Sequence, residues 1–281
     1  MNHFSSIAQT KAWIQQQRQA GKSIGFVPTM GALHDGHLEL MRCAQKENDL
    51  LVVSIFVNPI QFNNPDDLKK YPRTLDEDKK KLEAVGCDLL FAPDAKEMYP
   101  EGEPEKHYDF GQLDKVMEGA FRPGHFNGVA IVVKKLFDIV QPHRAYFGEK
   151  DFQQLTIIKK LVEMEKIPVE IVPCPIVREP DGLAMSSRNR LLTPEERKEA
   201  PFIYQTLQEA KLRRQHICAN PLRQMIINRF EGNEHFKLEY FDIVDDRTLQ
   251  PVKAWNDKVG TVACVAVWLG NVRLIDNIRI I

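Results

Sequence analysis

The stretch SIGFVPTMGALHDGHL, residues 23–38, decides the fold of this 281-residue chain. The apolar run over residues 23–27 predicts a strand, and the apolar spacing that follows predicts a helix over residues 38–46. The junction between them carries two histidines, His34 and His37, with a glycine in between. The stretch therefore predicts a strand-to-helix turn that holds two imidazoles at the start of a helix.

The start of a helix offers unpaired backbone N–H groups and a partial positive charge, which favour bound anions such as phosphates. Gly31 and Gly36 allow a tight turn and a close approach of a ligand to the backbone. The same positive field disfavours imidazolium, so we expect His34 and His37 to stay neutral and to donate hydrogen bonds to phosphate oxygens. Two histidines at this spacing also fit chance or half of a metal site, but the strand before them and the helix after them favour phosphate.

Strand and helix signals alternate through the first part of the chain. They predict strands over residues 50–57, 88–92, 145–147 and 169–177, and helices over residues 75–85, 129–140 and 152–165. Continuous apolar strands joined by helices imply a parallel sheet covered on both faces, an α/β fold. Ligands of such sheets bind beyond the carboxyl ends of the strands, where His34 and His37 are expected. The apolar stripe of the 129–140 helix predicts packing against the sheet or a second subunit.

The composition changes near residues 176–178, where we expect a domain boundary. Residues 178–189 are polar and turn-rich, and Thr193 followed by a proline predicts a capped helix start. Two helices and three strands follow. We therefore expect an α/β domain over residues 1–176 and a smaller α+β domain over residues 177–281.

The charge balance and the cysteine pattern exclude several function classes. The chain has 38 basic and 39 acidic residues, so no net field draws it to nucleic acid or to an anionic membrane. Its apolar runs stay below the roughly 20 residues that cross a bilayer, and its first residues lack the apolar stretch of a secretory signal. The five cysteines are never paired at C-x-x-C spacing and predict reduced, mostly buried thiols. We expect a cytoplasmic protein without a nucleic-acid or membrane partner.

Two further segments carry residues suited to phosphate. The stretch FGEKDFQQ, residues 147–154, follows a strand, and its Lys150 is a compact positive charge. Asp151 can accept from a ribose hydroxyl or cap the following helix. The stretch DGLAMSSRNR, residues 181–190, predicts a loop on which two hydroxyls precede the planar fork of Arg188. Alone, each segment fits an ordinary turn, but together with the histidine pair they indicate a polyphosphate site.

Neutral amides follow the second apolar strand, in VNPIQFN at residues 57–63. Asn58 and Gln61 suit the hydroxyls and carboxylate of a small substrate, although an Asn-Pro pair also favours a turn. The acidic residues that open the next helix complement its dipole, and one of them, Asp78, can also hold Mg²⁺ beside phosphates. The segment RPGHF, residues 122–126, is expected to shape the pocket for a small acid or to cap the helix behind it.

An H-x-G-H pattern after a first strand resembles the signature of the nucleotidyltransferase superfamily, whose members attack the α-phosphate of a nucleotide. The whole set of motifs, in this order, resembles the pantothenate synthetase family, also called pantoate–β-alanine ligases. The matching stretches are PTMGALHDGH, SIFVNPIQF with YPRT, RPGHFNGV, FGEKDFQQL and REPDGLAMSSRNR. The resemblance implies a Rossmann-like ATP-binding domain, a small C-terminal lid closing over the site, and a homodimer. It also implies ATP-dependent joining of (R)-pantoate to β-alanine through pantoyl adenylate, with Mg²⁺ present and AMP and pyrophosphate released.

The resemblance assigns roles to residues of this sequence. Those expected to act in catalysis offset charge on the phosphates and are His34, His37, Lys150, Ser186, Ser187 and Arg188. Those expected to complete the ATP site are Met30, Gly31, Gly148, Glu149, Asp151, Val177 and Met185. Asn58, Gln61 and Gln154 are expected to bind pantoate. Gln61 is also expected to contact β-alanine, and Asp78 to hold the metal.

Two other functions fit parts of the pattern. An H-x-G-H enzyme that transfers a nucleotide to a phosphate monoester needs extra basic residues for the acceptor phosphate, whereas Asn58 and Gln61 are neutral. A non-catalytic nucleotide-binding module has no use for these amides. Both alternatives therefore explain less of the sequence than the ligase does.

Overall fold

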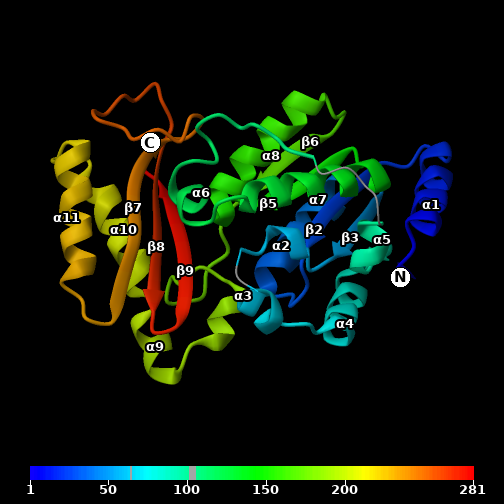
Figure 1. Cartoon of the computed structure of the whole chain (residues 1–281), viewed down its shortest axis with the longest axis horizontal. Coiled ribbons are helices and arrows are strands. Elements are labelled where there is room, and N and C mark those ends of the chain that lie inside the picture. Colours follow the sequence, from blue (N-terminus) through cyan, green and yellow to red (C-terminus); the bar gives the residue numbers. More distant parts are fainter. Residues whose placement is uncertain (64, 101–105) are drawn as a thin grey trace. The chain divides into compact units, whose positions relative to one another are not determined.

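The computed structural model describes residues 1–63, 65–100 and 106–281 and confirms an α/β fold (Figure 1). Within the described residues the chain divides into two compact units. The parallel-sheet unit comprises Met1–Phe110, Arg122–Glu149 and Gln154–Pro175, and the C-terminal unit comprises Gly111–Phe121, Lys150–Gln153 and Ile176–Ile281. Two short segments from the first part of the chain therefore belong to the C-terminal unit.

In the described part of the chain, six strands form one parallel sheet in the order β1-β4-β3-β2-β5-β6. The strands are β1 (Asn2–Phe4), β2 (Ile24–Thr29), β3 (Leu50–Ile55), β4 (Leu89–Phe91), β5 (Arg144–Gly148) and β6 (Glu170–Cys174). β2 pairs with β3 from Ile24 opposite Leu50 to Thr29 opposite Ile55, and with β5 on its other side. The chain winds outward from β2 in both directions, so the carboxyl end of β2 lies at a topological switch point, where α/β sheets bind ligands.

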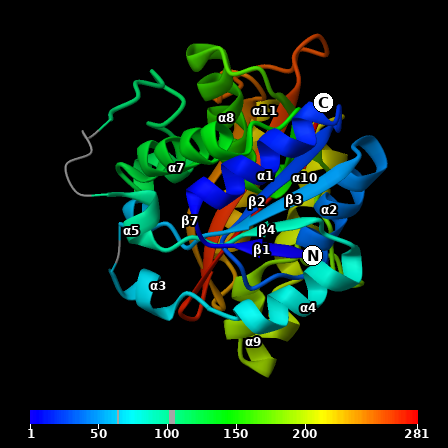
Figure 2. The same cartoon turned by 90° about the vertical axis from the view of Figure 1, so that its right-hand side faces the viewer.

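Helices cover both faces of this sheet (Figure 2). The helices in this part of the chain are α1 (Ile7–Gln19), α2 (Asp35–Glu47), α3 (Pro65–Lys70), α4 (Leu75–Val85), α5 (Ala95–Met98), α7 (His125–Val140) and α8 (Phe152–Glu165). On one face, Met41 of α2 and Leu82 of α4 are buried in a cluster with Val53 of β3. On the other, Phe137 of α7 packs edge-on against Phe26 of β2, with ring centroids 6.3 Å apart. The apolar side of α7 thus packs against the sheet of the same chain. None of the helices in the described residues is long and apolar enough to cross a membrane.

The sequence pattern does not predict β1 and α1. Their residues are mostly polar, and only Thr10 and Ile14 of α1 are buried, so no apolar period marks them. α2 begins at Asp35, ahead of the predicted start, because its first three residues carry no large apolar side chain. The predicted helices over residues 75–85 and 152–165 match α4 and α8. Patterning therefore finds elements that bury an apolar face and misses those that do not.

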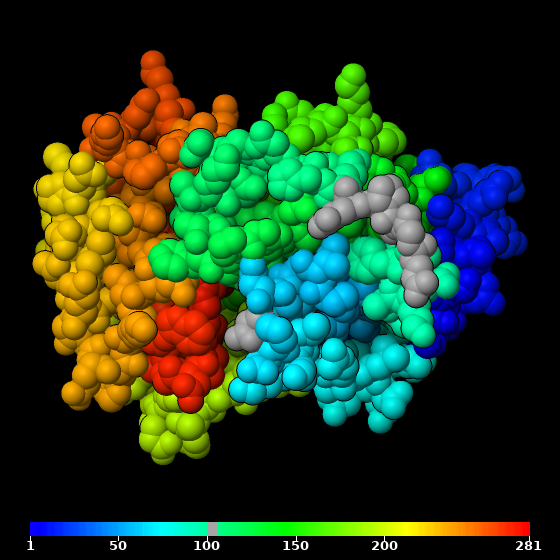
Figure 3. Space-filling model, in the orientation of Figure 1, coloured from blue at the N-terminus to red at the C-terminus, as the bar shows by residue number. Residues whose placement is uncertain are grey.

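The C-terminal unit is built on an antiparallel sheet in the order β7-β8-β9. Its elements are α6 (Met117–Phe121), the 3₁₀ helix η3 (Ser187–Leu191), α9 (Pro194–Glu199), α10 (Phe202–Arg213), α11 (Ala219–Glu231), β7 (Phe236–Asp245), β8 (Thr261–Leu269) and β9 (Val272–Arg279). The predicted capped helix start is confirmed, because Thr193 Oγ1 accepts from Glu196 N at 3.2 Å while Thr193 N donates to Glu196 Oε2 at 2.8 Å. α11, yellow in Figure 3, lies beside β7 at the left edge of that view.

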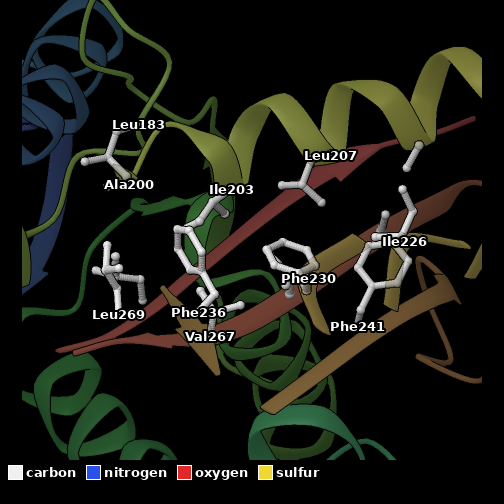
Figure 4. Packing of buried hydrophobic residues seen from close by; sticks show 14 of the residues in the cluster. Leu183, Ala200, Ile203, Leu207, Ile226, Phe230, Phe236, Phe241, Val267 and Leu269 are labelled. Atoms are coloured by element: carbon white, nitrogen blue, oxygen red, sulfur yellow. The ribbon is translucent and has the colours of Figure 1, made fainter. Parts of the chain in front are cut away.

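An apolar core fills one side of this antiparallel sheet (Figure 4). Ile203 and Leu207 of α10 meet Phe230 of α11 and Val267 of β8, and all four are almost fully buried. Leu183 belongs to the same core, although it lies on the polar loop that precedes η3. The buried side chain of Leu183 therefore anchors that loop to the C-terminal unit.

All five cysteines of the sequence lie in described residues and carry free thiols. Cys87, Cys174 and Cys264 are buried. Burial raises the pKa of Cys87 and that of Cys174 to about 12. Both thiols are therefore protonated at neutral pH and behave as small apolar side chains.

Candidate active site

The loop that follows β2 is held by a buried carboxylate from another element. Asp78, in the first turn of α4, accepts hydrogen bonds from the backbone N–H of Ala32 at 2.9 Å and of Leu33 at 2.8 Å. Gly31 and Ala32 have positive φ angles of 84° and 50°. A Cβ on Gly31 would lie within 3.1 Å of the Asp78 carboxylate. Glycine is therefore favoured at residue 31, and Asp78 fixes the turn that leads into α2.

The two histidines lie at the N-terminus of α2. His34 is the N-cap residue, and its carbonyl accepts from the N–H of His37 at 2.8 Å. The N–H of His34 donates in return to Nδ1 of His37 at 3.4 Å, and the two ring centroids are 4.0 Å apart. Because Nδ1 of His37 is an acceptor, the neutral ring carries its proton on Nε2. The pair thus supplies an imidazole N–H at a helix N-terminus, an arrangement suited to a phosphate oxygen.

The contacts of Asp78 give it an anchoring role in the loop that follows β2. Both of its carboxylate oxygens accept from backbone N–H groups, and Thr74 Oγ1 donates to one of them at 3.2 Å. Across residues 1–63, 65–100 and 106–281, no three His, Cys, Asp or Glu side chains gather so that they could hold a metal ion.

The amides predicted beyond β3 form a buried network. Asn58 and Gln61 are 1% and 8% exposed, and Asn58 Nδ2 donates to Gln61 Oε1 at 3.0 Å. Gln61 Nε2 lies 3.1 Å from the sulfur of Met30, a predicted ATP-site residue. Tyr99 donates its hydroxyl to Asn58 Oδ1 at 2.8 Å. Asn58 thus fixes the orientation of Gln61, whose amide carries a second N–H beside the one directed at Met30.

The start of α7 supports the same network. The carbonyl of Gly128 accepts from Asn58 Nδ2 at 3.1 Å, and Nδ1 of His125 lies 2.8 Å from the carbonyl oxygen of Gln61. A Cβ on Gly128 would come within 2.5 Å of the Ile60 carbonyl oxygen, so glycine is needed for this close approach. His125, from the RPGHF segment, therefore contacts the backbone of Gln61.

Lys150 lies in the 3₁₀ turn η2 (Glu149–Asp151), directly after β5. Its ammonium is 3.9 Å from the Asp151 carboxylate, and the lysine side chain is 19% exposed. Asn277 of β9 donates from Nδ2 to the Lys150 carbonyl at 2.9 Å. Lys150 is thus a half-buried cation whose backbone is held by a strand of its own unit.

The loop that carries Ser186, Ser187 and Arg188 begins as a short hairpin. Its arms meet where Met185 N donates to Val177 O at 3.0 Å, so two residues expected in the ATP site are hydrogen-bonded neighbours. Ser186 Oγ then accepts from Arg188 N at 3.3 Å and caps η3. The two hydroxyls and the guanidinium are therefore held on one short turn.

An ion pair closes the tip of this hairpin. Arg197 of α9 donates to the Asp181 carboxylate at 2.5 Å, and Leu183 N donates to the same side chain at 3.2 Å. The bond from Arg197 holds the pKa of Asp181 below its usual value. Asp181 is therefore ionised at neutral pH, and its charge stabilises the turn.

The residues predicted for the site are divided between the two units. The parallel-sheet unit holds His34, His37, Met30, Gly31, Asn58, Gln61, Asp78, Gly148, Glu149 and Gln154, and the C-terminal unit holds Lys150, Asp151, Val177, Met185, Ser186, Ser187 and Arg188. Sequence reasoning missed Tyr99 and Asn277. Tyr99 follows a short helix in a Pro- and Gly-rich excursion, and Asn277 lies in an ordinary strand, so neither belongs to a recognisable motif.

Known proteins match the chain over its whole length. A sequence model of the pantoate–β-alanine ligase family matches residues 2–279. Pantothenate synthetase of Bacteroides thetaiotaomicron is 50% identical over 279 residues, which cover 99% of both chains. The structure of pantothenate synthetase from Thermus thermophilus matches with a TM-score of 0.93 and 43% identity, covering 100% of this chain and 99% of that one.

A further solved structure is that of pantoate–β-alanine ligase from Francisella tularensis in complex with β-γ ATP and β-alanine. It matches with a TM-score of 0.83 and 38% identity, covering 99% of this chain and 97% of that one. Sequence and fold thus agree over the full length, and the chain belongs to the pantoate–β-alanine ligase family.

Proposed function

We propose that this protein condenses (R)-pantoate with β-alanine to pantothenate, splitting ATP into AMP and pyrophosphate by way of pantoyl adenylate. The observation that carries the proposal is the presence of two complementary chemistries in the parallel-sheet unit. An imidazole pair at a helix N-terminus suits phosphate, and a buried network of neutral amides suits a small acid. Membership of the family supports the same reaction.

In the first step, a carboxylate oxygen of pantoate attacks the α-phosphorus of ATP, and the bond from that phosphorus to pyrophosphate breaks. Negative charge on the phosphate oxygens is distributed differently in the transition state, so donors placed for that state lower the barrier. The residues proposed for this role are His34, His37, Lys150, Ser186, Ser187 and Arg188. The residues proposed to complete the ATP site are Met30, Gly31, Gly148, Glu149, Asp151, Val177 and Met185.

Neutral donors suit an acid that must act as a nucleophile. A cation paired with the carboxylate would stabilise its charge in the ground state and so lower its reactivity. Gln61 and Gln154 can donate amide N–H groups to pantoate without adding charge. Asn58, itself held by Tyr99 and Gly128, keeps the Gln61 amide in one orientation. The network therefore favours a carboxylate nucleophile over a phosphate monoester as the acceptor.

In the second step, the neutral amine of β-alanine attacks the carbonyl carbon of pantoyl adenylate. The carbon–oxygen bond to AMP breaks, and the nitrogen releases one proton as the amide forms. Gln61 is proposed to contact β-alanine as well as pantoate. No side chain becomes covalently attached to substrate in either step, so the protein acts by binding, orientation and charge stabilisation.

Three further features of the proposal rest on the resemblance to the family. They are the homodimer, the cytoplasmic location and the requirement for Mg²⁺. Bound with ATP, Mg²⁺ would neutralise part of the charge on the phosphates. Asp78, whose carboxylate accepts from the N–H groups of Ala32 and Leu33, stays the proposed protein ligand of that ion.

The proposed reaction is tested by exchange of labelled pyrophosphate into ATP, with Mg²⁺ and pantoate present and β-alanine absent. We expect exchange that depends on pantoate, because the first step is reversible and does not need the amine. Exchange that depends on a different acid, and not on pantoate, would mean that this other acid is the substrate. ATP binding without exchange for any acid would contradict the ligase and favour a nucleotide-binding module.

We predict that His37→Ala lowers the rate of pyrophosphate exchange by about 10²-fold or more, because a donor to the transition state is lost. The matched control is His216→Ala, which removes an exposed histidine from the C-terminal unit. An exchange rate in His37→Ala equal to that of the control would contradict the role of Nε2–H.

We predict that Gln61→Glu mainly weakens pantoate binding, because a nearly isosteric carboxylate replaces a neutral donor and repels the anionic acid. Titration calorimetry should show ATP binding close to that of wild type and a dissociation constant for pantoate raised at least ~10-fold. An equal loss of both ligands would mean that Gln61 supports the fold of the site and does not recognise the acid.

A further inference from the structure

One strand of the C-terminal unit touches both segments that carry the proposed phosphate ligands. Asp276 and Asn277 are neighbours on β9 and are 4% and 5% exposed. Successive side chains of a strand point to opposite faces of the sheet. Asp276 pairs in register with Val265, a member of the core beneath α10, whereas Asn277 pairs with Cys264, a member of the separate cluster that contains Phe152. The two polar residues therefore serve opposite faces.

On one face, Arg178 joins Asp276 to the loop that carries Ser186–Arg188. Its guanidinium donates to both oxygens of Asp276, at 2.7 and 3.0 Å, in a two-pronged ion pair. It also donates to the carbonyl of Gly182 at 3.1 Å and to that of Asn277 at 3.2 Å. The same guanidinium stacks on the ring of Tyr204, with its central carbon 3.7 Å from the ring centroid.

These contacts hold the hairpin at its base. Arg178 forms an antiparallel bridge with Ala184, and Asn189 Nδ2 donates to the carbonyl of Ala184 at 3.0 Å. Gly182 has a φ of 94°, and a Cβ there would come within 2.4 Å of the Tyr204 ring. The path from Arg178 to η3 is therefore fixed by backbone and side-chain contacts. Arg178 is bonded to Asp276 of β9 at one end, and η3 packs against β9 at the other.

On the other face, Asn277 holds the turn that carries Lys150. Its Nδ2 donates to the Lys150 carbonyl at 2.9 Å, and Phe152, two residues further on, packs into the cluster that includes Cys264. The side chain of Asn277 does not need to reach a phosphate for this role. It fixes the backbone from which the ammonium of Lys150 extends.

We propose that Arg178, Asp276 and Asn277 form a positioning clamp that sets the spacing between Lys150 and the Ser186–Arg188 turn for pyrophosphate departure. None of the three needs to touch ATP. The clamp rests on the proposed function, because it acts through residues that are assigned to the phosphates of ATP. It predicts that a variant of the clamp slows the first half-reaction, the formation of pantoyl adenylate. The second half-reaction, the attack of β-alanine, should keep its rate because pyrophosphate has left by then.

The first variant is Arg178→Lys, which keeps the positive charge and removes the planar fork that reaches Asp276 and Gly182 together. The matched control is Arg279→Lys, on the same strand, where an exposed arginine pairs with Asp246. Pyrophosphate exchange and the KM for ATP and for pantoate are measured for both. The KM for pantoate serves as the internal reference, since the amides that bind the acid lie in the other unit.

For Arg178→Lys we expect exchange slowed by ~10-fold or more, because small misplacement of charge-stabilising groups is costly. The KM for pantoate and the rate of β-alanine attack on added pantoyl adenylate should stay within twofold of wild type. A general loss of structure would slow both half-reactions alike and would overturn the clamp. So would Arg178→Lys behaving like the Arg279→Lys control. Absence of exchange in the wild-type protein would instead overturn the proposed function itself.

A double-mutant cycle tests the arm that leads to Lys150. Asn277→Ala is measured alone and in a Lys150→Ala background, with pyrophosphate exchange as the readout. If Asn277 acts through Lys150, its substitution slows exchange in the wild-type background and has almost no further effect once Lys150 is gone. Equal effects in both backgrounds would mean that Asn277 does not act through Lys150.

Discussion

The two hydrogen bonds from the backbone of Ala32 and Leu33 to the Asp78 carboxylate are the constraint on which the rest of the site depends. They tie the loop after β2 to the first turn of α4. In this loop Gly31 and Ala32 have positive φ angles, a conformation that is uncommon for a non-glycine residue such as Ala32. Because the loop is fixed, α2 begins at a defined residue, and His34 and His37 lie at its N-terminus.

The two units contribute different chemistry. In the proposed reaction the parallel-sheet unit supplies the imidazole pair and the amides of Asn58 and Gln61. The C-terminal unit holds the cations Lys150 and Arg188, which are proposed to act on the phosphates together with the hydroxyls of Ser186 and Ser187. Each set is held by buried polar contacts that do not themselves react, through Asn58 in one unit and Asp276 in the other.

Much of the fold follows from local sequence pattern, because the strands and helices of the parallel-sheet unit each bury a periodic apolar face. The same physics explains the failures. β1 and α1 bury little, and the first turn of α2 faces the site with polar residues, so periodicity does not mark them. The histidines, lysine and Ser-Ser-Arg turn were visible because they lie in contiguous motifs. Tyr99 and Asn277 lie outside these motifs, and Arg178 begins one of them, but the partners of all three are distant in the sequence and no local pattern reveals such partners.

The role of Asp78 is the point at which the sequence and the contacts lead to different expectations. As a metal ligand, its carboxylate would matter only when ATP and Mg²⁺ are bound. As an anchor, it stabilises the protein in their absence, because its loss leaves a buried backbone N–H without an acceptor, at a cost of about 1–3 kcal/mol.

The most direct test is the free energy of unfolding of Asp78→Asn, measured by urea denaturation without nucleotide or metal. Asp76→Asn, an exposed change in the same helical turn, is the control. The anchoring account predicts that Asp78→Asn loses about 1–3 kcal/mol while the control does not, and that raised Mg²⁺ fails to restore pyrophosphate exchange. Wild-type stability combined with exchange restored by Mg²⁺ would contradict it and would make Asp78 a metal ligand.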